Sequence, residues 1–433
     1  MSFPRSSESG SPVVDWSDSG VVALTGRPDG PVLMPPGRAA THARELISVL
    51  ASATGTSIGL DGARLLGERA AITGLRRGGA VSAGRHCRLL RTADGWAAVS
   101  CARPGDPDLI GALVGVNLDG ADPWPALTRW AREHPGTELG HRAELLGLAA
   151  GPVRTRADST VPGLPGTSDL RPPAATPWPG TASGMTARPV AGLLVVDFSA
   201  LWAGPLCAHL LGLAGARVVK VETPHRPDGA RRGNPEFYAL LHHGHESVVL
   251  DPEEPGGRRA LAALVDAADI VIESSRPRAL AGFGLDAARA VARGTSWLSI
   301  TAAGRSSHRV GFGDDIAAAA GLLAHDIGTN TPVFVGDAIA DPLTGITAAA
   351  LAASAPVDGS GVLWDLSMTD VVTATLTDEP AVHLRRHGEQ WIADTEAGPI
   401  PVADPTPRAP AGPAPESGAD TAGVLGSLRI PVP

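Results

Sequence analysis

Short, continuously apolar runs alternate with helix-spaced segments over residues 189–378. The runs are LLVVDFS (193–199), ARVVKVE (216–222), SVVLD (247–251), DIVIES (269–274) and SWLSITA (296–302). Strands that are apolar on both faces and joined by helices are typical of a parallel sheet covered on both sides. We therefore predict a large, doubly wound, Rossmann-like α/β domain with a mostly parallel sheet. Ligands of such sheets bind at the carboxyl ends of the strands, beside helix N-termini.

Residues 61–153 have a different pattern. The stretch HCRLLRTADGWAAVSCA (86–102) predicts a β-hairpin that turns at Asp94-Gly95. Two helices follow it, and the chain enters the first through Asp122-Pro123. These features predict a small α+β domain.

The remaining segments lack such patterns. Residues 154–188 are crowded with Pro, Gly, Ser and Thr, which is typical of an interdomain linker. The tail, residues 379–433, is rich in Pro, Ala and Gly, so we expect it to wrap over the surface with little structure of its own. We expect the polar residues 1–18 to be disordered.

Two stretches of the chain share one layout. FVGDAIADPLTGITAAALAAS (334–354) places two aspartates before an alanine-rich helix, and ALTGRPDGPVLMPPGRAATHARELISVLASA (23–53) has no acid at the matching place. In the first stretch, Asp341-Pro342 fits the preference for an N-cap aspartate followed by proline. We interpret residues 19–60 as a degenerate copy of the Asp341 segment.

Composition and charge restrict the function. A chain of 433 residues with 43% hydrophobic residues can form two or three globular domains. The net charge of −9 argues against a nucleic-acid partner. The polar, acid-containing start is unlike a signal peptide, and we find no stretch that would span a membrane, so we expect a cytoplasmic protein. Three scattered cysteines, Cys87, Cys101 and Cys207, suit reduced thiols.

Two site classes are not expected. Lys220 is the only lysine, so the chain cannot contain a Gly-Lys-Ser/Thr phosphate loop. His242, His243 and His245 cluster in LLHHGHESV, but no carboxylate spacing completes a metal site, and we expect a solvated loop there. We expect no metal.

In its ordered motifs the chain resembles the class III CoA-transferases, the CaiB/BaiF family. The resemblance rests on AGLLVVDFSALWAGPLCAHLLGLAGARVVKVETP, SVVLD, ADIVIE, ADPLTGITAAALAA and GSGVLWDLSMTDVV in the large domain, on DGWAAVSCARP and GLAAGPV in the small domain, and on the C-terminal GADTAGVLGSL. It departs from the family in order, because here the small domain precedes the large one. The fold that the resemblance implies agrees with the one predicted above.

By this resemblance Asp341, four residues before Gly345, is the nucleophile, and Asp337 is the rival candidate. An aspartate of this kind would attack an acyl-CoA thioester, form a mixed anhydride and then an aspartyl thioester, and so move CoA to another carboxylic acid. The partners implied are an acyl-CoA and a carboxylic acid, with no metal or redox cofactor.

The resemblance also implies where CoA binds. The turn SALWAGP (199–205) would receive the thioester, with the N–H groups of Ala203 and Gly204 polarising its carbonyl. Trp202 stands where some transferases have a glutamine that shields the anhydride. The adenine and phosphates would lie near Lys220, Ser274 and Arg276. From the residues alone, residues 199–205 are equally well an ordinary strand-to-helix turn. Lys220 would then be an exposed lysine at the end of a strand.

Two alternatives remain open. Racemases of this family have a histidine just before an Asp-Ile pair. In this chain Asp314 stands at that position, before Asp315-Ile316. The two acids could form an acid/base pair, or they could be ordinary residues of a first helical turn. A catalytically inactive CoA-binding homologue or subunit is the other alternative. Family members form dimers of interlocked rings, and we expect a homodimer here too.

Overall fold

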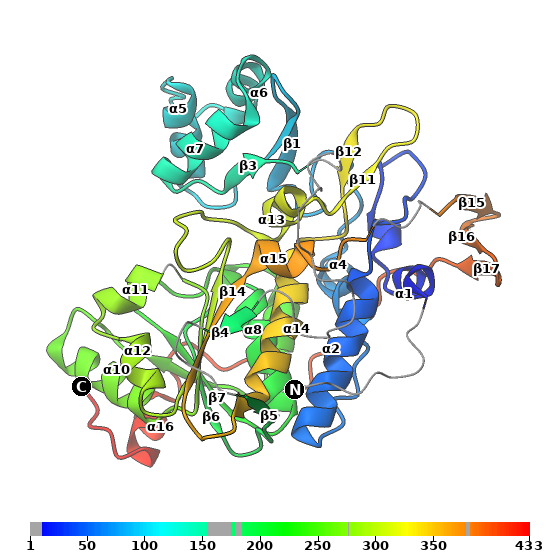
Figure 1. The fold of residues 1–433 in the computed structure, drawn as a ribbon. Helices are drawn as coiled ribbons and strands as arrows, with labels where there is room; N and C mark the ends of the chain where they lie inside the picture. Colours follow the sequence, from blue (N-terminus) through cyan, green and yellow to red (C-terminus); the bar gives the residue numbers. More distant parts are fainter. Residues whose placement is uncertain (1–10, 155–174, 178–183, 276, 378–381) are drawn as a thin grey trace.

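The computed structural model describes residues 11–154, 175–177, 184–275, 277–377 and 382–433 (Figure 1). Its centre is a seven-stranded sheet in the order β4-β14-β10-β9-β6-β7-β8. The strands are β4 (Ala175–Pro177), β6 (Leu194–Asp197), β7 (Arg217–Glu222), β8 (Glu246–Val249), β9 (Ile270–Glu273), β10 (Ser296–Thr301) and β14 (Val362–Ser367). All neighbours pair in parallel except β4 with β14. The predicted parallel sheet is therefore confirmed.

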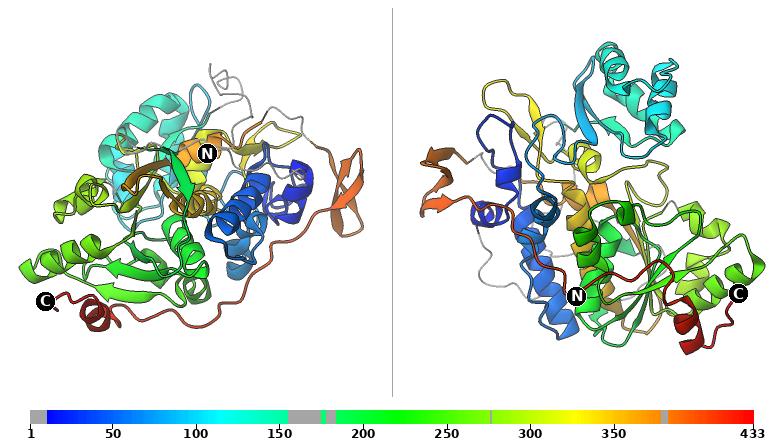
Figure 2. Two further views of the ribbon diagram at one scale, coloured as in Figure 1. Left: turned by 60° about the horizontal axis from the view of Figure 1, so that its bottom comes forward. Right: turned by 180° about the vertical axis from the view of Figure 1, so that it is seen from behind.

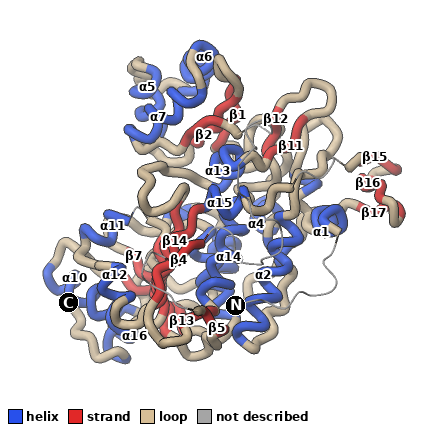
Figure 3. The backbone as a smooth tube through the Cα atoms, in the orientation of Figure 1, coloured by secondary structure: helices blue, strands red, loops and turns tan. Residues whose placement is uncertain are grey.

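Helices cover both faces of this sheet (Figures 1 and 3). On one face Val195 and Ile272 pack in a core shared with α8 (Ala203–Leu213), α14 (Ala340–Ala352) and α2 (Ala39–Thr54). On the other face Val196 and Val271 pack with α10 (Pro255–Ala267), α12 (Ala287–Val291) and α16 (Thr421–Ser427). Because neighbouring strand residues point to opposite faces, each strand contributes to both cores. The remaining helices of this part are α9 (Pro235–His242), α11 (Pro277–Gly282), α13 (Gly313–Ala320) and α15 (Met368–Thr373).

The small domain lies apart at the top of Figure 1. Its antiparallel sheet consists of β1 (Cys87–Arg91), β2 (Trp96–Ser100) and β3 (Ala150–Pro152), and its helices are α5 (Asp106–Val114), α6 (Pro123–Glu133) and α7 (Gly136–Leu146). The hairpin turns at Asp94-Gly95 as predicted, and Thr92 N–H bonds to Gly95 O at 3.0 Å. Asp122 caps α6 through Trp124 N–H at 3.2 Å. This agreement shows that the local turn and cap signals were sufficient here.

Two terminal segments are more ordered than expected. Residues 12–18 form helix α1 (Pro12–Asp18), so the prediction of disorder is wrong for this part; residues 1–10 lie outside the described residues. Trp16 is 1% exposed and its indole N–H donates to Gly37 O at 2.7 Å, which anchors the helix. Burial of one large aromatic ring therefore outweighs the polar composition of the segment.

The tail also has more structure than its composition indicated. It forms a three-stranded sheet of β15 (Leu384–His387), β16 (Gln390–Thr395) and β17 (Gly398–Pro401). An extended strap then crosses the molecule to α16, as Figure 2 shows. Arg408 of the strap pairs with buried Glu68 of α4 (Glu68–Thr73). Charge pairing and strand pairing thus fix a segment that hydrophobic periodicity does not reveal. Much of the predicted linker lies outside the described residues.

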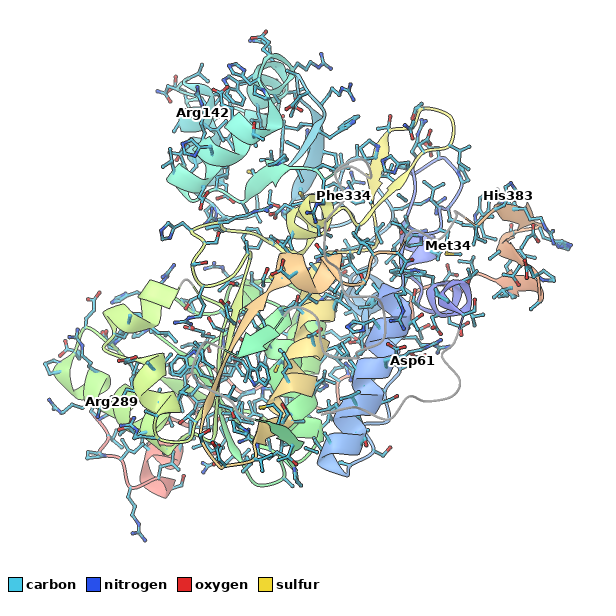
Figure 4. The ribbon with its side chains drawn as sticks, in the orientation of Figure 1. Met34, Asp61, Arg142, Arg289, Phe334 and His383 are labelled. Carbon is cyan, nitrogen blue, oxygen red and sulfur yellow. The ribbon has the colours of Figure 1, made fainter. Side chains whose placement is uncertain are left out.

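The packing between the domains is apolar near α13. Phe334, labelled in Figure 4, packs with Leu89 of β1 and Ala318 of α13. Phe334 belongs to β12 (Pro332–Phe334), which pairs with β11 (Leu323–His325). Within the described residues, no helix combines the length and apolar character that crossing a bilayer requires.

Candidate functional site

Asp341 lies in the first turn of α14, and it is not the helix cap. The helix begins at Ala340, Ile339 occupies the N-cap position, and no side chain caps the helix. The N-cap prediction is therefore wrong by two residues. The rest of α14 is buried, whereas Asp341 is only partly buried and accepts a hydrogen bond from the Gly313 N–H. Asp341 is thus the least buried residue of this helix, although its carboxylate is enclosed enough for burial to raise its pKa.

Gly345 has a packing reason to be glycine. A Cβ at this position would lie 2.5 Å from Ala203 O and 3.0 Å from Leu206 Cβ, so only glycine lets α14 approach α8 this closely. Asp341 is four residues earlier and therefore lies on the same side of the helix. The close approach brings the Asp341 end of α14 beside the turn that precedes α8.

That turn is held by carboxylates and a hydroxyl. Ser199 N–H donates to Asp197 at 2.8 Å, Ala200 N–H to Ser274 Oγ at 3.2 Å, and Leu201 N–H to Asp228 Oδ1 at 3.0 Å. Leu201 adopts a left-handed φ of 71°, a conformation that costs energy for a branched side chain. The turn is therefore kept in one strained shape by its neighbours.

The predicted oxyanion donors begin helix α8. Ala203 is its first residue and Trp202, at the N-cap, makes no side-chain capping bond, so the first N–H groups lack the partner that a cap would supply. A Cβ at Gly204 would lie 2.1 Å from the Ser199 side chain, which explains the glycine. Ala203 and Gly204 are both buried. Ser274, predicted to touch CoA, supports this turn, and Arg276 lies outside the described residues.

Lys220 is an internal ion-pair partner. It is 1% exposed, and its Nζ lies 3.0 Å from Asp228 Oδ2 and 3.6 Å from Asp197 Oδ2. The expectation of an exposed lysine is wrong, because the two acids that hold the 199–203 turn require a buried counter-charge. Although burial opposes it, their charges raise the pKa of Lys220. In this structure the ammonium supports the turn and does not face solvent.

Arg69 of α4 joins the site from the other end of the sequence. Its Nε and Nη2 donate to Asp337 at 2.8 and 2.6 Å, and its guanidinium lies 4.6 Å from the ring centroid of Trp202. Asp337 is fully buried and Trp202 is 2% exposed. Asp337 is thus neutralised by a bidentate pair, which leaves Asp341 as the more accessible of the two rival acids.

Asp314 and Asp315 open helix α13. Asp314 Oδ1 accepts from Ala338 N–H at 2.9 Å, in the loop before α14. Asp315 Oδ1 accepts from Phe312 N–H at 2.9 Å and from Ser100 Oγ, on strand β2, at 2.8 Å. Asp314 therefore holds the Asp341 loop, and Asp315 connects α13 to the small domain.

Burial and repulsion between their negative charges raise the pKa values of Asp314 and Asp341. Burial raises the pKa of Asp341 to about 7, the charges of Asp314 and Asp315 add to the shift, and Arg69 and the Gly313 N–H oppose it. Burial and the charge of Asp337 raise the pKa of Asp314 to about 7, against Arg69 and the Ala338 N–H. Near neutral pH each of these two carboxyl groups is therefore partly protonated.

The histidine cluster is not a solvated loop. His242 and His245 are 1% and 6% exposed, whereas His243 is exposed. Burial lowers the pKa of both buried rings, that of His245 to about 3, so they remain neutral. Within the described residues no group of His, Cys, Asp or Glu could hold a metal ion.

Comparison with known proteins shows the family to which this sequence belongs. The chain is 28% identical over 224 residues to succinyl-CoA:glutarate CoA-transferase of Mus musculus, covering 47% of this chain and 51% of the relative. It is 31% identical over 105 residues to formyl-CoA:oxalate CoA-transferase of Afipia carboxidovorans, covering 23% and 25%. A CAIB/BAIF family protein from Brucella suis aligns with a TM-score of 0.40 and 26% identity, covering 45% of this chain and 56% of that one. The chain spans about half the length of the first two curated relatives that it matches. The sequence model of CoA-transferase family III matches residues 190–419, more than half of the chain. The protein therefore belongs to CoA-transferase family III.

Proposed function

We propose that the protein transfers CoA between an acyl-CoA and a free carboxylic acid, with Asp341 as the nucleophile. The observation that carries this proposal is the position of the partly exposed Asp341 in the first turn of α14, one turn before Gly345, which packs against Ala203 at the uncapped start of α8. Its rival Asp337 is fully buried against Arg69. The site thus has one carboxylate free to react and a set of N–H groups near it.

The reaction has two exchanges at Asp341. A carboxylate oxygen of Asp341 attacks the thioester carbon, and the C–S bond breaks to give a mixed anhydride and CoA thiolate. The thiolate attacks the aspartyl carbonyl, which releases the first acid and leaves an aspartyl-CoA thioester. The second acid attacks this thioester, which expels CoA thiolate and forms a second mixed anhydride with Asp341. The thiolate then attacks the acyl carbonyl of this anhydride, which gives the new acyl-CoA and releases the Asp341 carboxylate. The N–H groups of Ala203 and Gly204 stabilise the oxyanions that develop.

Protonation of Asp341 sets the pH range of the reaction. Its pKa of about 7 means that the nucleophilic carboxylate is lost as pH falls below neutrality. The N-terminus of α14 and the guanidinium of Arg69 favour the ionised state. We expect the rate of exchange to rise with pH through about 7.

The relatives narrow the substrate class. Two of them are named for succinyl-CoA with glutarate and for formyl-CoA with oxalate. We therefore propose that a short dicarboxylic acid is one partner here, with no metal or redox cofactor.

All three cysteines are free thiols, which suits a reducing compartment such as the cytoplasm. We propose a homodimer as the working assembly.

Trapping the intermediate tests the proposal. The protein is incubated with succinyl-CoA and then with hydroxylamine, which converts an aspartyl anhydride or thioester to a hydroxamate. Peptide mass spectrometry should find this modification on Asp341. Its absence from Asp341→Asn, with retention in Asp337→Asn, would identify the nucleophile. No adduct in the unaltered protein with succinyl-, glutaryl-, oxalyl- or formyl-CoA would refute the transferase and favour an inactive CoA-binding homologue.

One observation favours a second candidate. Asp314 and Asp341 interact electrostatically and both have a pKa of about 7, which would suit the acid and base of a racemase. The test is incubation with a 2-methylacyl-CoA in deuterated water. Under the transferase proposal the α-carbon retains its proton, and rapid deuterium uptake would support the racemase.

A further inference from the structure

A hollow on the small domain lies where the edge strand β1 meets α6, away from the Asp341 site. Its volume is about 570 Å³, within the range of small-molecule sites. Its charged and aromatic lining consists of Arg88, Asp122, Trp124, Arg129, Arg132 and Glu133. Nothing in the proposed transferase reaction uses these residues.

Arg88 is held with hydrogen-bonding capacity unused. Its guanidinium lies 4.3 Å from the ring centroid of Trp124, and Trp124 is 8% exposed. The Nε of Arg88 is buried and has no hydrogen-bond partner among the described residues. The guanidinium makes no hydrogen bond to the described residues, and Arg88 as a whole is partly exposed, so its terminal N–H groups are available to a ligand in the hollow. Stacking on the ring fixes the planar fork and reduces the entropy lost on binding an anion.

Arg129 and Arg132 add two cations on one face of α6. Both are exposed, and in the described part of the chain neither forms an ion pair. The same domain does pair other arginines: Arg103 with Asp106 at 2.7 Å and Arg142 with Glu138 at 2.8 Å. Arg91 of the same domain also forms no ion pair with the described residues, so what distinguishes the hollow is that three such arginines line it together.

The two carboxylates of the lining do not cancel this charge. Asp122 uses Oδ1 to cap α6, and Glu133 ends the same helix. The two stand at opposite ends of a helix that is about 16 Å long, and the three arginines of the lining exceed the two carboxylates by one charge. Three guanidinium groups thus surround a site with unused donors.

We propose that this hollow binds a phosphate-bearing small molecule, with Arg88 as its bidentate anchor and Arg129 and Arg132 as further contacts. Arginine forks match phosphate oxygens, and several cations favour a group with more than one negative charge. The site is separate from Asp341. Leu89 of β1 faces the α13 core, whereas Leu90, on the other face of the strand with Arg88, packs in the core of the small domain.

Site-resolved arginine modification tests the proposal on the full-length protein without any acyl-CoA, so its outcome is independent of the transferase assay. Phenylglyoxal is applied with and without inorganic pyrophosphate or adenosine 3′,5′-bisphosphate, and peptide mass spectrometry follows each arginine. Both phosphates should slow modification of Arg129 and Arg132 by about tenfold at saturation, and exposed Arg259 of α10 should react unchanged. Equal protection by succinate, or protection that includes Arg259, would overturn the proposal.

Arg91 provides a matched control. It is exposed on the same strand and lies 5.5 Å from the ring centroid of Trp96, outside the lining of the hollow. Arg88→Met should weaken pyrophosphate binding about tenfold or more by calorimetry, and Arg91→Met should not change it. If Arg88→Met does not fold, the surface variant Arg129→Glu/Arg132→Glu decides. Binding unaffected by that variant, or weakened equally by Arg91→Met, would refute the site.

Discussion

The segments around α2 and α14 follow the same backbone plan and differ in their chemistry. Helix α2 begins at Ala39 and α14 at Ala340, so their second residues are Ala40 and Asp341. Two residues before each helix the backbone is left-handed, with φ of 73° at Gly37 and 44° at Ala338. The helices lie side by side (Figure 1). The comparison shows that the local fold does not require the carboxylate.

The surroundings differ in a way that explains the division of roles. In α2, the partly buried Arg44 forms ion pairs with Asp15 and Asp61. In α14, every residue except Asp341 is buried. The segment without the acid supports the one that has it, because Thr25 Oγ1 accepts a hydrogen bond from Gly336 N–H at 3.2 Å. The segment around α2 thus helps to hold the loop that precedes α14.

Asp341→Ala, which makes the α14 segment resemble α2, should have the largest effect. We expect exchange to be abolished and CoA binding to stay within about tenfold, because the carboxylate makes the covalent bond whereas the nucleotide is held elsewhere. Exchange assays and calorimetry with CoA measure both. Adding Ala40→Asp should not restore activity, since Ala40 is fully buried and an acid there would have no partner. Full activity of Asp341→Ala would instead move the assignment to Asp337 or end the transferase proposal.

Arg69→Met should have the next largest effect, on stability. It leaves Asp337 fully buried without its partner, which costs about 3–5 kcal/mol in unfolding free energy. Arg38→Met in the α2 segment is the control, because its partner Glu45 is partly exposed and the loss should be below about 1 kcal/mol. Urea denaturation measures both. Equal losses would contradict the view that the two segments differ in how they use charge.

Substituting the two left-handed residues, Gly37 and Ala338, tests whether this backbone conformation reduces the free energy of unfolding equally in both segments. A Cβ at Gly37 would lie 2.3 Å from Thr375 O, so Gly37→Ala should destabilise by about 1–3 kcal/mol. Ala338→Gly removes a left-handed alanine and should stabilise by about 1 kcal/mol. Denaturation midpoints of the two variants should therefore move in opposite directions. A loss in both would show that the alanine conformation is not strained.

Sequence patterns were sufficient for the large sheet and the small-domain hairpin, because continuous apolar strands and the Asp94-Gly95 turn are local signals. They also singled out Asp341, whose role as the nucleophile stays a prediction, but they did not give its position inside the helix. Arg69 had no such signal, since its partner Asp337 is far away in the sequence. Lys220 and His242 were expected at the surface because the sequence does not show which polar side chains the fold buries. Pairings between distant segments thus account for what was missed.

The smallest predicted effect concerns the charge beside the α14 segment. Asp314 raises the pKa of Asp341, so Asp314→Asn should lower that pKa and shift the acid limb of the exchange profile to lower pH by up to about one unit. The asparagine oxygen can still accept the Ala338 N–H, which preserves the loop. Asp315→Asn should produce a smaller shift, because Asp315 is the weaker of the two charges acting on Asp341. A shift to higher pH, or an equal shift in both variants, would show that Asp314 does not set the protonation of Asp341.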